Sequence, residues 1–520
     1  MKAFLMYPDR DFDLDRDRPA NEPDLSRDLE LNVLLKAMAD DDEFLLLVAR
    51  QGIHSNLTNP AEIVYRQHVL ADCISKPDVV RGLYEVAVAA LAGEKQIFGW
   101  LFRDSPDTIL NRSRKVMELF VSQLHSLRDI SDAESAGFRS EGFAQFFAML
   151  AKELGDDYFA EMAAQLGELA FRRGMLISAG LGKGSKGVRY TLQRQPEQQS
   201  WRDRLPGRKR PGYTFMLASQ DEAGMRMLSE LGSRGLNGAA NAVAQSADHI
   251  RSFFQMLRAE LGFYIGCLNL RERLSARGEP VCFPVPASLA TERADQASLS
   301  ARGLYDVCLA LSIESRAVGN DLDADGKRLI MVTGANQGGK STFLRSLGLA
   351  QLMMQAGMFV AAESFTASTS TGIFTHFKRE EDATMEKGKL DEELARMAVI
   401  AGHIPGGALL LCNESFASTN EREGSEIARQ IIRAMTEAGV RVVFVTHMYD
   451  LAGGYYAGHD PGMLFLRAER QPDGHRTFRL LVHEPLPTSF GEDVYREVFG
   501  TADQTARSRG KAAEDGTQVM

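Results

Sequence analysis

The residues with the clearest chemical potential lie in one short glycine-rich segment, GANQGGKST. It fits the phosphate-loop pattern G-x-x-x-x-G-K-[ST] and stands between a strand-like apolar run, RLIMVT, and a helical run, FLRSLGLAQLMMQ. Glycines allow backbone N–H groups to close around phosphate oxygens at a helix N-terminus, where the helix dipole favours anions. We expect Lys340 to neutralise the β- and γ-phosphates of a nucleotide and the Ser341 hydroxyl to ligate Mg²⁺. The residues predicted to bind the nucleotide are Gly334, Ala335, Asn336, Gln337, Gly338, Gly339, Lys340, Ser341 and Thr342.

A second polar pair follows the apolar run ALLLC, at a place where nucleoside triphosphatases of this type usually carry Asp-Glu. Here the pair is Asn413-Glu414. Glu414 retains the carboxylate that polarises an attacking water, which makes it the predicted catalytic base. Asn413 is neutral and offers only an amide oxygen to Mg²⁺ or to a water bound to the metal. Because a unit charge at about 4 Å is worth about 4 kcal/mol at an effective dielectric of about 20, we expect weaker Mg²⁺ binding or slow turnover, but not loss of all hydrolysis.

A third polar group follows the apolar run VRVVFVT, which ends in Thr446-His447. A histidine just beyond a strand in this kind of domain can sense the γ-phosphate and align the attacking water. A single histidine is more often structural. Because His447 follows the third apolar run in the expected order, we interpret it as a functional residue.

The elements that must position these groups are strands that alternate with helices. From about residue 280 to residue 500, short apolar runs are separated by helical segments, which is typical of a parallel α/β domain. Near its end, Pro472-Asp473-Gly474 divides two alternating runs, which predicts a β-hairpin.

The part of the chain before the α/β domain has a different pattern. Residues 26–279 are mostly helical in period, with a long helix expected over about 234–276 and a small strand-containing insertion over about 176–216. Residues 1–25 are rich in Asp, Arg and Pro, which indicates an extended or poorly ordered arm. Residues 501–520 are small and polar, and we expect a disordered tail.

A basic loop, WRDRLPGRKRPG, lies within the insertion. It could contact a nucleic-acid backbone, with Trp201 as a stacking group, or it could be only a solvated hairpin tip. The candidate DNA-binding residues are Arg202, Arg204, Arg208, Lys209 and Arg210.

Composition narrows the class of protein. The chain has 520 residues and a formal net charge of −10, so contact with nucleic acid would have to come from a local patch. Its five cysteines have no paired close spacing, which argues against a zinc ribbon and a disulfide framework. Since no apolar run reaches about 18 residues, we expect a cytoplasmic protein with no membrane partner.

Taken together, these motifs resemble the ATPase domain of the MutS family of DNA mismatch-repair and related proteins. The phosphate loop with its flanking elements, ALLLCNESFASTNEREG and FVTHMYDLA stand where the family has its phosphate loop, metal strand and switch histidine. TNPAEIVYRQHVLADC resembles the start of the family's helical core, and the long helices through residue 276 resemble its lever.

The resemblance implies an ABC-like P-loop NTPase domain preceded by an all-α core and lever. It also implies ATP and Mg²⁺ as cofactors, DNA as a partner, and a homodimer in which the neighbour completes each ATP site. The family's N-terminal mismatch-reading and connector domains have no counterpart before the helical core, so we expect recognition of branched or unusual DNA and not of mispairs. The family's Ser-containing signature segment is replaced by Lys387–Leu394, with Gly388 or Lys389 in place of the serine.

Two functions remain open at this point. The first is a DNA-binding ATPase that gates a dimeric clamp, favoured by the resemblance and the basic loop. The second is an ATP-dependent clamp on another protein without DNA binding, favoured by the acidic charge balance. A phosphoryl-transferring kinase is disfavoured, because no Arg-rich lid segment follows the ATPase strands.

Overall fold

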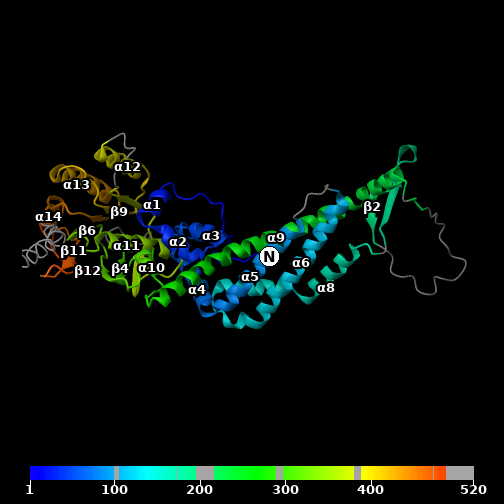
Figure 1. Ribbon diagram of the computed structural model, residues 1–520, viewed down its shortest axis with the longest axis horizontal. Coiled ribbons are helices and arrows are strands. Elements are labelled where there is room, and N and C mark those ends of the chain that lie inside the picture. Colours follow the sequence, from blue (N-terminus) through cyan, green and yellow to red (C-terminus); the bar gives the residue numbers. More distant parts are fainter. Residues whose placement is uncertain are drawn as a thin grey trace, which may run out of the picture. The chain divides into compact units, whose positions relative to one another are not determined.

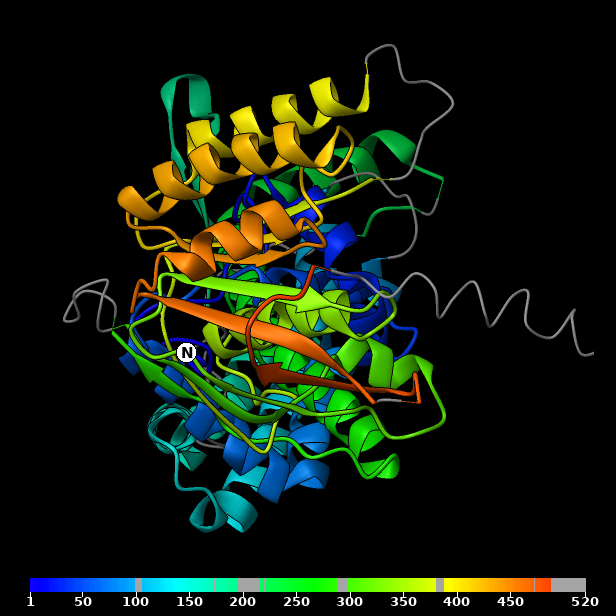
Figure 2. The same cartoon turned by 90° about the vertical axis from the view of Figure 1, so that its left-hand side faces the viewer.

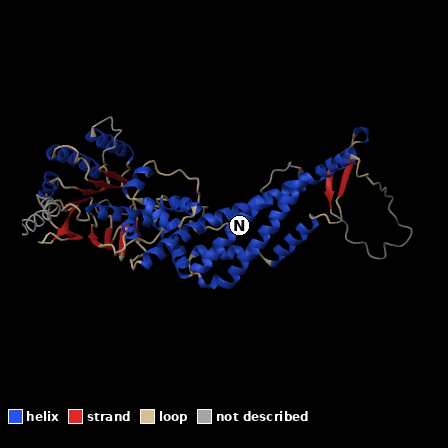
Figure 3. Cartoon of the chain, viewed as in Figure 1, coloured by secondary structure: helices blue, strands red, loops and turns tan. Residues whose placement is uncertain are grey.

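The computed structural model describes residues 1–98, 105–172, 174–194, 216–218, 220–288, 297–379, 388–471 and 473–487 (Figures 1 and 3). By the density of contacts along the backbone, the chain divides into two compact units. Unit 1 combines Met1–Phe12 with Ser75–Leu261, and unit 2 combines Asp13–Ile74 with Gly262–Met520. The division therefore falls inside the helical region and not at the boundary predicted near residue 280.

Unit 1 is mainly helical, as the sequence pattern predicts. Its helices are α5 (Pro77–Phe98), α6 (Pro106–Glu134), α7 (Glu141–Glu153), α8 (Asp156–Glu168) and the first part of α9 (Glu222–Ala276), which begins earlier than expected. Ser105 caps α6 by accepting a hydrogen bond from the Thr108 N–H, and Ser140 caps α7 in the same way. Phenylalanines on α6, α7 and α9 are buried and form the core of the unit.

The segment predicted as a poorly ordered arm, residues 1–25, is divided between the units: Met1–Phe12 belong to unit 1, and the residues from Asp13 on, which include the start of α1 (Glu22–Asp28), belong to unit 2. Leu5, Met6 and Phe12 are buried. Their backbone N–H groups donate to the carboxylate of Glu260, which is fully buried on α9, at 2.5, 3.4 and 3.4 Å. The charged residues between these apolar positions made the segment look extended and solvated, whereas its apolar side chains and backbone are held by α9.

The predicted insertion contains one described β-hairpin. Strands β1 (Leu176–Leu181) and β2 (Gly187–Gln193) pair antiparallel, which confirms the strand prediction for this part of the insertion (Figure 1). The rest of the insertion up to residue 215, including the whole basic loop, lies outside the described residues.

Unit 2 holds the α/β part of the chain, with two sheets. The larger sheet has the order β12-β11-β6-β10-β9-β8, and β12 is its antiparallel strand. Its strands are β6 (Leu329–Gly334), β8 (Ile373–Phe377), β9 (Leu409–Asn413), β10 (Arg441–Val445), β11 (Met463–Arg470) and β12 (Arg476–Val482). The smaller sheet has the order β3-β7-β4-β5, formed by β3 (Val285–Ala287), β7 (Ser364–Ser368), β4 (Leu299–Leu304) and β5 (Asn320–Asp323).

Helices cover both faces of the larger sheet (Figure 2). Helices α12 (Lys389–His403), α13 (Glu421–Glu437) and α14 (Tyr449–Ala457) share one apolar core with β6, β9 and β10. Helix α11 (Lys340–Gln355) packs against the same central strands and is buried along most of its length. The remaining helices of unit 2 are α1 (Glu22–Asp28), α2 (Leu31–Ala39), α3 (Glu43–Ile53), α4 (Pro60–Ser75), α10 (Val307–Ser312) and the end of α9.

The three apolar runs singled out in the sequence are the central strands β6, β10 and β9. They run parallel and lie side by side. Since the carboxyl ends of parallel strands meet at one edge, the polar groups that follow them are brought together there. The predicted hairpin at residues 472–474 is also confirmed, because β11 and β12 pair antiparallel across it.

Candidate functional site

The glycine-rich loop connects β6 directly to α11 and has a backbone that requires small residues. Gly334 and Gly339 adopt φ values of 110° and 88°, a region that side chains disfavour. A Cβ on Gly334 would lie 2.8 Å from the backbone nitrogen of Ala468, and one on Gly338 would lie 2.9 Å from the carbonyl oxygen of Ala335. The loop is thus a close-fitting cradle of backbone N–H groups at the N-terminus of a long helix, which is the geometry of an anion-binding site.

Lys340, the first residue of α11, is buried at the centre of this loop. Its Nζ donates to the carbonyl oxygens of Gly334 and Ala335, both at 2.9 Å. Burial lowers the pKa of Lys340, and the nearby carboxylate of Glu414 acts in the opposite direction. The ammonium group of Lys340 is therefore held inside the loop by these two carbonyl oxygens. A phosphate oxygen bound in the loop could replace them as its partner.

Ser341 and Asn413, the two predicted metal ligands, are in direct contact. The Ser341 hydroxyl donates to Asn413 Oδ1 at 2.9 Å. Asn413 is the last residue of β9, and its carbonyl oxygen accepts from the Lys378 N–H at 2.9 Å, which fixes its backbone. An amide oxygen and a hydroxyl are both acceptable ligands for Mg²⁺, but neither contributes a negative charge.

Glu414 and His447, the two predicted catalytic residues, also lie together. Glu414 Oε1 is 3.8 Å from His447 Nδ1. The contact with His447 lowers the pKa of Glu414, and Lys340 adds to the effect, whereas burial opposes it. Glu414 has a left-handed backbone with φ of 52°, and its N–H donates to the carbonyl oxygen of Val445 at 2.9 Å. The backbone of Glu414 is thus tied to the end of β10, and its carboxylate lies near His447 and remains ionised at neutral pH.

The residue after Glu414 is fixed by a buried histidine that the sequence analysis did not single out. His376 Nδ1 is 2.7 Å from the Ser415 hydroxyl, and His376 Nε2 is 3.0 Å from the Glu393 carbonyl oxygen of α12. Burial lowers the pKa of His376 to about 4, so the ring is neutral at physiological pH. The loop that carries Glu414 is therefore tied to the start of α12.

A cavity of about 640 Å³ lies against the phosphate loop. Besides the loop and Glu414, its lining combines apolar side chains, among them Ile313, Val318 and Phe478, with polar ones such as Asp306, Arg316 and Asn320. Phe478 belongs to β12 and is 48% exposed, so an aromatic face is open beside the loop. Sequence reasoning missed this residue because only the strand order, with β12 two positions from β6, brings the hairpin to the loop.

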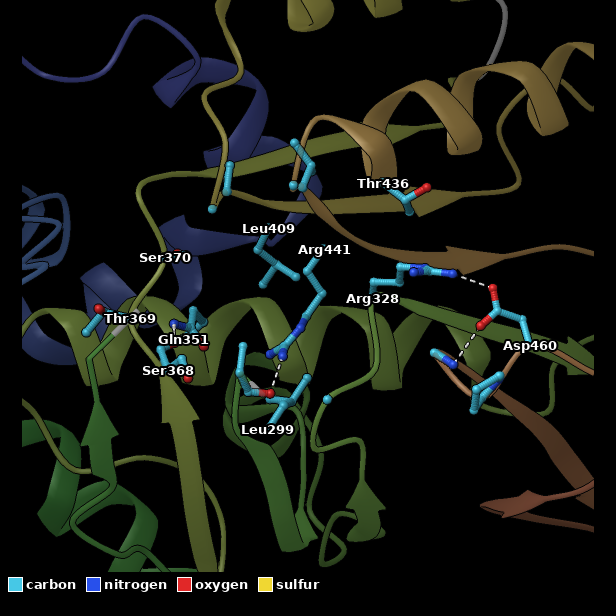
Figure 4. A pocket seen from close by; sticks show the side chains of 18 residues that line it. Leu299, Arg328, Gln351, Ser368, Thr369, Ser370, Leu409, Thr436, Arg441 and Asp460 are labelled. Atoms are coloured by element: carbon cyan, nitrogen blue, oxygen red, sulfur yellow. Dashed lines mark hydrogen bonds and ion pairs between the residues drawn. The ribbon is translucent and has the colours of Figure 1, made fainter. Parts of the chain in front are cut away.

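A second cavity, of about 500 Å³, lies at the opposite edge of the larger sheet, where β9 and β10 begin (Figure 4). Its two arginines already have partners. Arg441 donates to the carbonyl oxygens of Ser298 and Ala297, and Arg328 forms an ion pair with Asp460. Because both arginines are already paired, they are less available to bind an anion than the groups of the phosphate loop are.

Other predicted residues are only partly described. The candidate DNA-binding residues 202–210 lie outside the described part of the chain, as does Lys387 of the signature-like segment. Gly388 is the N-cap residue of α12 and is exposed. None of the helices in the described ranges is long and apolar enough to cross a membrane.

Two protein-family models match the chain. A family model described as MutS2 N-terminal domain matches residues 58–277, and one described as MutS domain V matches residues 330–498.

Several curated relatives align with part of the chain. An endonuclease MutS2 of Geobacillus kaustophilus is 30% identical over 33% of this chain and 22% of its own length. A DNA mismatch repair protein MutS of Thermotoga maritima is 34% identical over 26% of this chain and 17% of its own length. The MutS protein homolog 4 of Mus musculus is 27% identical over 29% of this chain and 16% of its own length. The aligned part of the chain therefore spans about a fifth of the length of these relatives.

The fold and the site define a class of protein in which a helical region precedes a mixed α/β region, with a glycine-rich loop between a buried strand and a helix. Both regions are matched by models of one family. The chain belongs to the MutS family, which confirms the prediction made from its motifs.

Proposed function

We propose that the chain is a MutS-like ATPase with an ABC-like P-loop domain, and that ATP binding and hydrolysis gate a dimeric clamp on DNA. The observation that carries this proposal is the convergence at one sheet edge. Three parallel strands bring Lys340, the Ser341–Asn413 pair and the Glu414–His447 pair to the same loop. A cation, a metal-binding pair and an ionised carboxylate are the parts that phosphoryl transfer to water requires.

The residues of the loop fit a nucleoside triphosphate and Mg²⁺. The close approach of Ala468 and Ala335 leaves room only for glycine at positions 334 and 338, so the backbone can surround phosphate oxygens. Lys340 would hold the β- and γ-phosphates, and Ser341 and Asn413 would face the metal. Mg²⁺ bound there would neutralise phosphate charge. The cavity beside Phe478 has the volume for a nucleobase, and Ile313, Val318 and Phe478 would supply apolar contacts to it.

Glu414 would orient and deprotonate the attacking water, and His447 would position both. The lowered pKa of Glu414 keeps the carboxylate able to accept a proton at neutral pH. Because Asn413 supplies no charge to the metal, we expect slow, Mg²⁺-dependent turnover.

The DNA part of the proposal rests on family membership and on the basic loop at residues 202–210. In this proposal the chain is a cytoplasmic homodimer, the segment around Gly388 faces the nucleotide of the neighbouring subunit, and the helical region of residues 26–279 acts as core and lever. Branched or otherwise unusual DNA is the expected ligand, recognised by structure and not by sequence.

The test is a salt titration of binding to duplex, single-stranded and junction DNA. Replacing Arg208, Lys209 and Arg210 by glutamine should weaken binding to all sequences and reduce the log–log salt slope by at most about 3, since each phosphate contact contributes about 0.9. The matched control replaces Arg422, Arg429 and Arg433 of α13, which removes the same charge from another part of the chain. An unchanged slope in a folded variant would assign the loop to solvation alone.

A second candidate is an ATP-dependent clamp on another protein, with no role for DNA. The formal net charge of −10 favours it, because no global basic field draws the chain to nucleic acid. This candidate would lead if the wild-type chain hydrolyses ATP but binds none of the three DNA forms at low salt.

A further inference from the structure

Arg476 lies beside the phosphate loop, although neither its neighbours in sequence nor any motif points to it. It is the first residue of β12, and its Nη1 donates to Gln337 Oε1 in the middle of the loop at 3.1 Å. The pairing of strands explains this position. Ala468 of β11 is in register with Gly334 at the start of the loop, and Arg470 of the same strand is in register with Arg476.

The guanidinium of Arg476 is incompletely paired. Its Nε and Nη2 are buried and have no hydrogen-bond partner among the described residues. A guanidinium has five N–H donors and stays charged in proteins, so burial of unpaired nitrogens is unfavourable unless a charged acceptor is available. Arginine is also the side chain best suited to hold a phosphate group through two parallel hydrogen bonds.

The charges around Arg476 point to an anion as the missing partner. Lys340 donates to the carbonyl oxygens of Gly334 and Ala335, and Arg476 donates to Gln337, so both cations contact the same short loop. Two cations thus contact one loop, and the carboxylate of Glu414 lines the cavity beside it. A nucleotide with two or three phosphates would bring the negative charge that this arrangement lacks.

We propose that Arg476 binds the β- and γ-phosphates of the nucleotide, turning from Gln337 toward them. This inference rests on the proposed function, because it assigns one more residue to the same nucleotide site. It makes the hairpin β11–β12 part of the site, so that the chain would distinguish a triphosphate from a diphosphate partly through a residue about 140 positions beyond the loop.

The test measures dissociation constants for ADP and for an ATP analogue with a non-hydrolysable β–γ bridge, both with Mg²⁺. Arg476→Ala should weaken binding of the ATP analogue by about 10- to 100-fold, the range of a charge-assisted hydrogen bond, and binding of ADP by less. Arg476→Lys should restore part of the loss, whereas Arg476→Gln should not. Arg479→Ala, on the same strand and exposed, is the matched control and should stay within about twofold of wild type.

A structural role through Gln337 predicts a different pattern. If Arg476 only holds the loop, Gln337→Ala should cost as much as Arg476→Ala, the double variant should cost no more, and Arg476→Gln should bind as well as Arg476→Lys. That pattern, or an Arg476→Ala variant no weaker than Arg479→Ala, would overturn the inference. Failure of the wild-type chain to bind either nucleotide would instead overturn the proposed function.

Discussion

The two edges of the larger sheet each carry a cavity and basic side chains, but they differ in how those side chains are paired. At the edge where β9 and β10 begin, Arg441 and Arg328 are bonded to carbonyl oxygens and to Asp460. At the edge where the strands end, Lys340 donates to loop carbonyls near the carboxylate of Glu414, and Arg476 keeps two buried nitrogens without a hydrogen-bond partner among the described residues. This difference in pairing, and not the presence of a cavity, is the reason why we propose the nucleotide site at the edge where the strands end.

The largest expected effect follows from removing Lys340, the cation inside the loop at the edge where the strands end (the carboxyl edge). Lys340→Ala should abolish ATP hydrolysis and weaken nucleotide binding, because no other side chain described within the loop neutralises the phosphates. Arg328→Ala, which removes a cation from the other edge, should leave hydrolysis unchanged and alter stability by about 0–1 kcal/mol, since its ion pair with Asp460 is partly exposed to solvent. Phosphate release and urea unfolding measure the two quantities. Equal loss of hydrolysis in both variants would show that the edges are not functionally distinct.

A smaller loss is expected when the site keeps its cations but loses its base. Glu414→Gln should bind nucleotide with unchanged affinity and hydrolyse it about 10²- to 10⁴-fold more slowly, because proton transfer to a positioned base contributes by that amount. The ATP-bound state should therefore accumulate, which can be followed with a labelled nucleotide in a single-turnover experiment. Hydrolysis at the wild-type rate would show that Glu414 is not the base.

The buried carboxylate of unit 1 provides a contrast to Glu414. Burial raises the pKa of Glu260 to about 7 from 4.5, although three backbone N–H groups favour the charged form. The folded chain therefore holds the proton more tightly than the unfolded chain, and the stability that this gives at low pH should fall as pH rises from about 4.5 to about 7.

Glu260→Gln should remove that pH dependence, which amounts to about 3 kcal/mol in the free energy of unfolding, since each pKa unit corresponds to about 1.4 kcal/mol. Because the amide keeps only one of the two oxygens that accept from Leu5, Met6 and Phe12, the dependence on pH and not the absolute stability is the quantity to compare. Urea unfolding at about pH 5 and pH 8 measures the effect. Leu5→Ala is a useful control, because it removes apolar packing next to the carboxylate and should lower stability equally at both pH values. An unchanged pH dependence in Glu260→Gln would show that another group is responsible.

The smallest expected effect concerns the metal pair. Asn413→Asp should raise the ATPase rate or lower the Mg²⁺ concentration needed by a few-fold, because it replaces the amide that accepts from Ser341 by a carboxylate. Water between the carboxylate and the metal would reduce the charge interaction to about 1 kcal/mol. Titration of the rate with Mg²⁺ measures this, and Asn413→Ala serves as the control that removes the amide oxygen. No change or a loss in Asn413→Asp would indicate that the site is built around the amide.

The carboxyl edge could be predicted from sequence to the extent that its residues follow apolar runs. Lys340, Asn413 and His447 each stand in or just after a strand with a recognisable pattern, and parallel strands place such residues together. These patterns are local in the sequence. Only the adjacency of three parallel strands is needed in addition to predict that the residues form one site.

The residues that sequence reasoning missed depend on pairing over long distances in the chain. Arg476 and Phe478 reach the loop because β11 pairs with β6, which no periodicity reveals. The N-terminal segment was predicted as an arm because its composition is polar, whereas its partner, Glu260, is 255 residues from Leu5. A polar composition predicts solvent exposure on average, whereas here buried apolar side chains and the contacts of three backbone N–H groups with Glu260 hold residues 1–12 in place.

The most direct test of the central claim is a crystal structure of the full chain with Mg²⁺ and a non-hydrolysable ATP analogue. We expect the triphosphate within the loop of residues 334–342, with Lys340 and Arg476 on its phosphates and Mg²⁺ on the side of Ser341 and Asn413. A nucleotide bound in the cavity of Arg328 and Arg441, or none bound at saturating concentration, would contradict it.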